Sequence, residues 1–363
     1  MKKRLTLLCT LLCLSQALLG CAMLRMERQT FPLCMAIDQL EDGLIRIAVQ
    51  APQSGSSGGD AQTPKYEIIS ATGTSIGETL HLLSASTPYP INYSQLELCI
   101  LGYQLASTSE VRAILRELSL LITMRPTAVV SVSLGSALEI ISLQKPDFGM
   151  RLSTHYEILF DHLRSENLLP DSSLASLVRG QGEGRRDHLL CLCAVNPQLV
   201  PKNPEPAKES KADEGDGGGS PAFSVGEPWA DAPLPENIVA GTLAHTSSNP
   251  VEFLGAATLG DSRVSGYLTA AETQLVVRAH KETTRRIAIH GDRLQLQVLI
   301  PAQSSLAQHQ GALLSAIQKL QQLHCDALGF GGVSAGVFWS DAAWQAFQFK
   351  SKYPSAEVIV TPQ

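Results

Sequence analysis

The sequence predicts a protein of mixed α/β (α+β) class with several domains, preceded by a lipoprotein signal peptide. Short segments rich in aliphatic and β-branched residues alternate with longer amphipathic segments, which is typical of β-sheets packed by helices. A stretch rich in Pro, Gly, Ser and charged residues at 196–235 separates two such regions, 34–195 and 236–363. We expect three small domains, each with a mixed β-sheet packed by helices: two in the first region, divided near 145–152, and one in the second.

The first 21 residues have the parts of a signal peptide. A basic start precedes an apolar run at 5–19 that is too short to remain as a spanning helix. The run ends in Leu-Leu-Gly-Cys at 18–21, which resembles the lipobox of bacterial lipoproteins, where the cysteine sulfur receives diacylglycerol. We therefore predict a signal peptide at 1–20, lipidation of Cys21 and a short tether at 21–33. The alternative is an ordinary signal peptide with a cysteine there by chance.

Composition limits the functions that the chain can serve. The formal net charge is -6, and loss of the three cations of the signal peptide makes the mature chain still more acidic. An acidic body argues against nucleic acid and against broad binding to anionic lipids. After Cys21 no apolar run reaches the roughly 18–20 residues of a spanning helix. We therefore expect a body outside the bilayer, attached to membrane lipid through Cys21.

The cysteines do not indicate a disulfide framework. An odd number follows Cys21, whereas a framework of bridges needs pairs. We interpret them as incidental, with Cys34 and Cys99 as small buried hydrophobic residues in strand-like runs. The residues after Cys21 are Cys34, Cys99, Cys191, Cys193 and Cys325.

Periodicity and capping pairs define the elements of the first region. The strand at 44–49 alternates apolar and polar residues, and the helix after Ser75 has Glu78 in place for a capping box. The helix at 109–122 has one apolar stripe. The full expected order is strands 31–37, 44–49 and 66–71, helix from Ser75, strand 92–101, helix 109–122, strand 127–134, helix 137–142, a helix from a Thr154/Glu157 capping box to 167, and strand 189–195.

The second region follows a predicted flexible linker. The segment 196–235 has too little apolar surface to offset the entropy of ordering it. Beyond it, Thr269 and Glu272 are placed to form a capping box, and Gly291-Asp292 suits a two-residue hairpin turn. The expected elements are strands 253–258 and 264–268, a helix from Thr269, a hairpin of 286–289 and 293–300, a helix at 305–324, and strand 357–361.

Two motifs resemble a catalytic site and a phosphate-binding site, but both are better explained as loops without a chemical role. Gly332-Val-Ser-Ala-Gly336 matches the nucleophile elbow of hydrolases, but the triad histidine of that fold follows the serine, and no histidine follows Ser334. Gly180–Gly184 lacks the lysine of a phosphate-binding loop and does not join a strand to a helix. We interpret both as glycine-rich loops, and we predict no catalytic residue.

Two side-chain clusters could hold a ligand. His188, Cys191 and Cys193 are close in sequence, but zinc sites usually have four ligands and no second cluster completes the set. We favour packing over metal binding and predict no metal and no cofactor. An aromatic group near the C-terminus is interpreted as core packing rather than a ligand platform; it comprises Phe338, Trp339, Trp344 and Phe347.

Several segments together resemble the Ger(x)C family, the C subunits of spore germinant receptors. They occur in the family's order across nearly the whole chain, although each segment alone is a weak signal. The segments are the lipobox at Cys21, Ala-Ile-Asp-Gln-Leu-Glu-Asp-Gly at 36–43, Gly-Thr-Ser-Ile-Gly-Glu at 73–78, Leu-Glu-Leu-Cys-Ile-Leu-Gly at 96–102, the run 255–273, and Cys-Asp-Ala-Leu-Gly-Phe-Gly at 325–331 with Trp344 beyond it.

The resemblance implies a fold of three mixed α/β domains and a subunit that is not an enzyme. It implies a lipid-anchored protein on the outer face of the spore inner membrane, working with two integral-membrane partners, the A and B subunits. Small nutrient ligands would trigger release of ions and dipicolinate. Which surface meets the partners, and whether this subunit binds a nutrient itself, stay open.

Two other functions remain as alternatives. A lipid-anchored solute-binding protein of a transporter would have two similar α/β lobes around a cleft, and the sequence shows no such repeat. An envelope hydrolase is disfavoured because no base follows Ser334.

Overall fold

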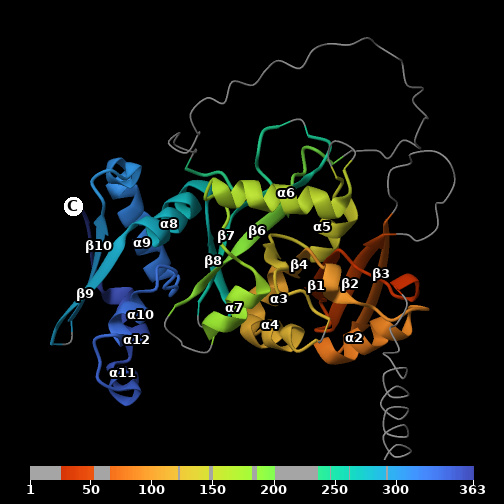
Figure 1. The fold of residues 1–363 in the computed structure, drawn as a ribbon, viewed down its shortest axis with the longest axis horizontal. Coiled ribbons are helices and arrows are strands. Elements are labelled where there is room, and N and C mark those ends of the chain that lie inside the picture. Colours follow the sequence, from red (N-terminus) through yellow and green to blue (C-terminus); the bar gives the residue numbers. More distant parts are fainter. Residues whose placement is uncertain are drawn as a thin grey trace, which may run out of the picture.

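The described part of the chain forms two β-sheets with helices around them (Figure 1). In this computed structural model, the described residues are 26–52, 66–121, 123–146, 150–181, 186–200, 236–245, 247–260, 262–291 and 293–363. The predicted signal peptide, Cys21 and most of the predicted linker lie outside these residues and stay predictions. Among the described residues, no helix is long and apolar enough to span a bilayer.

The large sheet has eight strands in the order β3-β2-β1-β4-β5-β6-β7-β8. Its four central strands, β1, β4, β5 and β6, run parallel, and an antiparallel pair of strands extends the sheet on each side. The central strands are buried on both faces, as expected for parallel strands covered by helices. The strands are β1 (Cys34–Gln39), β2 (Ile45–Pro52), β3 (Tyr66–Gly73), β4 (Leu98–Gly102), β5 (Val129–Ser133), β6 (His188–Val195), β7 (Val251–Leu259) and β8 (Val264–Leu268).

Helices cover both faces of this sheet, so the body has three layers (Figure 1). One face packs against α2 (Ile76–Ala85), α3 (Tyr103–Thr108), α4 (Val111–Ser119) and α7 (Leu174–Gln181). The other face packs against α5 (Ala137–Leu143) and α6 (Leu152–Ser165). Alternate residues of β1 serve the two faces: Met35 and Ile37 join the first core, and Cys34 joins the second.

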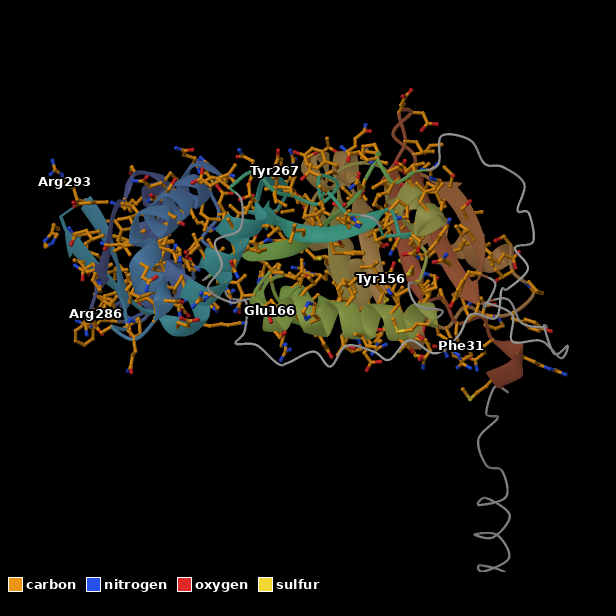
Figure 2. All side chains as sticks on the ribbon, turned by 90° about the horizontal axis from the view of Figure 1, so that it is seen from above. Phe31, Tyr156, Glu166, Tyr267, Arg286 and Arg293 are labelled. Atoms are coloured by element: carbon orange, nitrogen blue, oxygen red, sulfur yellow. The ribbon has the colours of Figure 1, made fainter. Side chains whose placement is uncertain are left out.

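The C-terminal body contains a three-stranded sheet in the order β11-β10-β9. Its core includes Leu189, Ala256 and Leu268 of the large sheet, so apolar packing continues from one sheet to the other. Figure 2 shows the resulting long axis, with Phe31 near one end and Arg286 and Arg293 at the other. The elements are α8 (Ala270–Glu282), β9 (Thr284–His290), β10 (Arg293–Ile300), α9 (Gln310–Gln322), α10 (Phe330–Ala335), α11 (Asp341–Phe347), α12 (Phe349–Lys352) and β11 (Glu357–Pro362).

The mixed α/β class is confirmed, but the sheets are not divided as expected. We predicted three sheets, and the described residues form two. The expected boundary near 145–152 falls between β5 and β6, which are hydrogen-bonded neighbours. From beyond the linker, β7 pairs with β6 and β8 pairs with β7. The reason is that β7 is buried along its whole length and needs a partner on each edge. Local periodicity cannot show which distant strand supplies that partner.

The capping predictions have mixed outcomes. Thr269 and Glu272 form the complete capping box at the start of α8, so that prediction is confirmed. At the start of α2 only half of the predicted box forms: Ser75 accepts the Glu78 N–H, but Glu78 Oε2 accepts the Thr74 N–H in place of the Ser75 N–H. The Thr154/Glu157 box is wrong, because α6 begins at Leu152. The Leu152 N–H donates to the distant Tyr66 hydroxyl at 2.9 Å, and this tertiary contact replaces a local cap.

The described part of the predicted tether is attached to the large sheet. Thr30 pairs with Ile91, and the Leu33 N–H donates to the Gln50 carbonyl at 2.8 Å. The nine residue steps from Cys21 to Thr30 span at most about 32 Å. A lipid at Cys21 would therefore hold the Phe31 end of the molecule close to the membrane.

Candidate functional site

Two buried aspartates join the large sheet to the C-terminal body. Asp187 directly precedes β6, and Asp326 lies in the turn between α9 and α10. The Asp187 N–H donates to the Asp326 carbonyl at 3.1 Å, and the Asp326 N–H donates to Asp187 Oδ2 at 2.8 Å. These reciprocal bonds fix the two bodies to each other at one point.

Asp187 also gathers cations from two other elements. Arg112 Nη2 of α4 donates to Asp187 Oδ1 at 2.9 Å and to the Gly260 carbonyl at 2.9 Å. Lys350 Nζ of α12 contacts Asp187 Oδ2. Since Asp187 is 1% exposed, this is a buried carboxylate whose charge is balanced by partners. We call Arg112, Asp187, Asp326 and Lys350 the junction network.

Asp326 caps the N-terminus of α10. Its carboxylate accepts the N–H groups of Gly329, Phe330 and Gly331 at 3.0, 2.9 and 2.7 Å. Burial raises the pKa of Asp326 to about 7, although hydrogen bonds from Gly331 and Phe330 favour its charged form. Asp326 lies in the segment 325–331 that resembles the germinant receptor family, so that segment serves to position a helix and hold the junction.

Asp38, in the segment 36–43, has a similar structural role. Its carboxylate accepts the N–H groups of Ala137 and Leu138 at 2.7 and 2.9 Å, at the start of α5. Arg46 Nη2 donates to it at 3.1 Å. A Cβ on Gly102 would lie 2.2 Å from Asp38 Oδ1, so this contact requires glycine at that position. Asp38 therefore acts as a distant helix cap.

A cavity with cationic side chains lies beside the junction network. Its volume is about 180 Å³, and it is bounded by the start of β6 and by α8. Apolar side chains form part of its lining, and the rest is mostly basic. The lining residues are Pro170, Asp171, Arg186, His188, Leu189, Val276, Val277, His280, Lys281 and Ala327. We call it the basic cavity.

The two histidines of the basic cavity are kept neutral. Burial, reinforced by the charge of Arg186, lowers the pKa of His188 to about 4. Burial and the charges of Arg186 and Arg285 lower the pKa of His280 to about 4. Arg285 Nη1 lies 2.8 Å from His280 Nδ1 and can only donate, so His280 Nδ1 accepts and its proton sits on Nε2.

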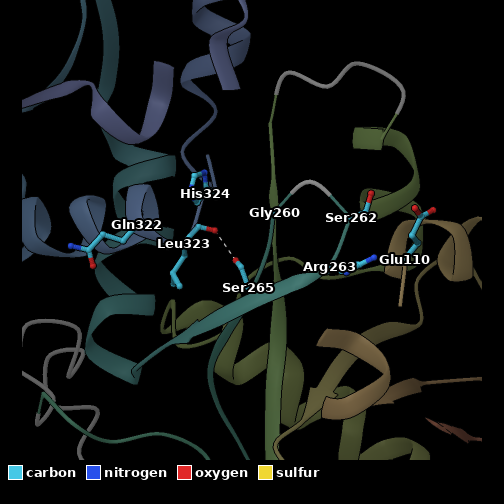
Figure 3. A pocket seen from close by; sticks show the side chains of 8 residues that line it. All are labelled: Glu110, Gly260, Ser262, Arg263, Ser265, Gln322, Leu323 and His324. Atoms are coloured by element: carbon cyan, nitrogen blue, oxygen red, sulfur yellow. Dashed lines mark hydrogen bonds between the residues drawn. The ribbon is translucent and has the colours of Figure 1, made fainter. Parts of the chain in front are cut away.

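A larger groove lies on another part of the junction, with a volume of about 420 Å³ (Figure 3). It is formed by the start of α4, the β7–β8 turn and the end of α9. Figure 3 shows its polar side chains in two groups, Glu110 and Arg263 on one side and Gln322 and His324 on the other. Ser265 Oγ donates to the Leu323 carbonyl at 2.7 Å. The groove therefore has no convergent set of reactive groups.

The nucleophile-elbow motif is part of a helix. Gly332–Ala335 belongs to α10, and Ser334 is fully buried there. In a hydrolase the elbow serine sits on an exposed turn between a strand and a helix. Ser334 Oγ has no hydrogen-bond partner in the described part of the chain, so no base activates it. This position cannot serve as an accessible nucleophile.

The cysteines near His188 are inert in the described structure. Cys191 and Cys193 are fully buried in β6, and they pack in the same apolar core. Burial raises the pKa of Cys191 to about 12 and that of Cys193 further. The described residues contain no group of three or more His, Cys, Asp and Glu side chains placed to hold a metal ion. Most of the glycine-rich segment 180–184 lies outside those residues.

The C-terminal aromatic residues only partly pack as predicted. Phe338 packs against Trp344 and Phe347, with ring centroids 5.9 and 5.0 Å apart. Trp339 is fully exposed, so the interpretation of it as core is wrong. The reason is that it lies in the connection between the short helices α10 and α11, and α11 has no buried residue.

Sequence comparison identifies a known domain in the first part of the chain. Residues 23–192 match a family model described as "Spore germination protein N-terminal domain". Residues 23–192 are therefore a spore germination protein N-terminal domain, and in this domain the chain is similar to the Ger(x)C family of germinant receptor C subunits. No curated protein matches this chain in sequence. Among solved structures, "Crystal Structure of the GerBC protein" is similar, with a TM-score of 0.44 and 10% identity over 90% of this chain and 95% of that chain.

Proposed function

We propose that this protein is the lipid-anchored, non-enzymatic subunit of a nutrient germinant receptor. The match of residues 23–192 to the germination domain is the observation that carries this function. The domain begins at residue 23, directly after the predicted lipidation site at Cys21. A domain of this family that follows a lipobox at once is the arrangement expected of an anchored receptor subunit.

The anchor would hold the body on the outer face of the spore inner membrane. With Thr30 already paired to Ile91, only a short segment separates Cys21 from the body, so the body has little freedom to leave the membrane surface. Two integral-membrane partners, the A and B subunits, would meet it there. Restriction to the membrane plane raises their effective concentration and favours assembly without requiring tight individual contacts.

The residues that could have been reactive have structural roles, which supports a function in recognition and coupling and not in catalysis. Ser334 is buried inside a helix, and the raised pKa of Cys191 keeps its thiol protonated. The buried aspartates Asp38 and Asp326 cap helices. A solute-binding protein of a transporter is the alternative from sequence. Its two similar lobes contrast with the eight-stranded and three-stranded sheets of this chain.

We expect that spores lacking this protein will release no dipicolinate in response to at least one nutrient. The measurement is dipicolinate release from deletion spores across a panel of amino acids and sugars, with restored release when the wild-type gene is returned. Total dipicolinate after boiling is the control for normal loading of the spores. Normal release with every nutrient in the panel would contradict the receptor function.

A further inference from the structure

His188 has an unused polar atom beside the basic cavity. Its side chain lines the cavity, and the residue is only 8% exposed. His188 Nε2 has no hydrogen-bond partner in the described part of the chain. Buried polar atoms are nearly always paired in folded proteins, because leaving one unpaired is costly. An atom in this position is therefore suited to a ligand that enters the cavity.

Arg186 provides a second unused group in the same cavity. Its Nε donates to the Ala327 carbonyl at 3.1 Å, which holds the guanidinium in place. Nη1 and Nη2 have no partner among the described residues. A guanidinium edge with two free N–H groups matches the two oxygens of a carboxylate. Burial and the neighbouring charge of Arg285 lower the pKa of Arg186, and the charges of Asp326 and Asp171 offset this only in part, so an anion here would relieve an unfavourable charge.

The other cations in or next to the cavity already have partners. Lys281 Nζ donates to Asn167 Oδ1 at 2.6 Å. Arg285 donates to His280 Nδ1 and contacts the Leu328 carbonyl. Because both histidines are neutral at pH 7, Arg186 is the one cation of the described lining with unused N–H groups. The one acidic residue of that lining, Asp171, already accepts hydrogen bonds from the Ser173 N–H and the Ser176 hydroxyl. This balance suits one negative charge rather than the two of a phosphate.

We propose that the basic cavity binds a small molecule through a carboxylate group held by Arg186 and His188. Arg186 donates two hydrogen bonds to the carboxylate, and His188 donates one from Nε2. The short apolar remainder of the ligand packs on Leu189, Val276 and Ala327. A volume of about 180 Å³ lies below the roughly 300–1,000 Å³ of pockets for drug-sized ligands, so the ligand has few non-hydrogen atoms. Binding here is independent of the role in germination.

The test uses the purified mature protein with histidine imidazole NMR signals as the readout. Propionate is the probe, at constant ionic strength, and propionamide is its neutral counterpart. We expect propionate to shift the His188 and His280 signals with a saturable, millimolar dissociation constant, and propionamide to shift neither. Arg186→Gln should weaken propionate binding at least 10-fold, and His188→Gln several-fold.

Exposed residues at the far end of the C-terminal body supply matched controls. Arg286→Gln and His290→Gln remove the same groups from the β9–β10 hairpin, and both should bind propionate like the wild type. No saturable shift in the wild-type protein, or equal affinity in Arg186→Gln, would overturn the site. Tighter binding of inorganic phosphate than of propionate, or binding of propionamide as strong as that of propionate, would overturn the carboxylate assignment. These wild-type titrations decide the matter even where a variant fails to fold.

Discussion

Asp187→Ala is expected to lower the free energy of unfolding by about 3 kcal/mol, because removal of a buried carboxylate leaves the charges of its cationic partners uncompensated. The variant leaves Arg112 and Lys350 without their carboxylate and removes the acceptor of the Asp326 N–H. Arg112 is 17% exposed and Lys350 is 37% exposed, so water can partly solvate them in the variant. This places the cost at the low end of the range for buried pairs. The measurement is urea unfolding of the mature protein.

Asp161→Ala is the matched control for this variant. Asp161 is 76% exposed and lies 3.6 Å from Arg164 on the same helix, so its loss should change stability by less than about 1 kcal/mol. Similar midpoints for Asp187→Ala and Asp161→Ala would contradict the view that the junction network holds the two bodies together. A loss confined to the C-terminal body, seen as earlier hydrogen exchange there, would agree with it.

Cys21→Ala should abolish lipid attachment completely, because the cysteine sulfur is the atom that accepts the diacylglycerol. We expect the precursor to keep its signal peptide and to incorporate no labelled fatty acid. Labelling in growing, sporulating cells and the mass of the purified chain measure both effects.

A cysteine inside the predicted signal peptide provides the control. Cys13→Ala changes a thiol in the apolar run before the lipobox and should leave labelling and processing unchanged. Labelling of Cys21→Ala at the wild-type level would contradict the anchor. Loss of labelling in both variants would instead indicate that the apolar run itself had been damaged.

Local patterns in the sequence predict much of this fold. The Thr269/Glu272 capping box depends only on neighbouring residues, and it forms as predicted at the start of α8. The hairpin of β9 and β10 also follows from alternation and a two-residue turn. The position of β7 beside β6 does not, because a strand buried on both faces carries no mark of its partner.

The junction and its cavity could not be predicted from local patterns. The junction network joins α4, the start of β6, the α9–α10 turn and α12, which are far apart in sequence. Sequence reasoning singled out His188 for its nearby cysteines, whereas its imidazole lines a cavity with Arg186 and His280. Side chains alternate along β6, so the sequence alone could have placed His188 on the opposite face of the strand from Cys191 and Cys193. Which residues of other elements line the cavity with His188 depends on tertiary packing.

The junction also gives a physical route by which a ligand could influence the rest of the molecule. Arg186 spans the basic cavity and the Ala327 carbonyl, one residue beyond Asp326. A carboxylate bound to Arg186 would thus act beside the contacts that hold the C-terminal body. We expect such a ligand to stabilise the attachment of that body, since a ligand that binds the assembled form favours it.

The most direct measurement of the central claim is purification of the wild-type lipidated protein from detergent-solubilised spore membranes, with identification of the proteins that accompany it. The proposed function predicts two integral-membrane partners in constant proportion to this chain, and neither in a matched purification from spores that express Cys21→Ala. Recovery with the subunits of a transporter, or with no membrane protein under conditions that keep known membrane complexes intact, would contradict a germinant receptor subunit.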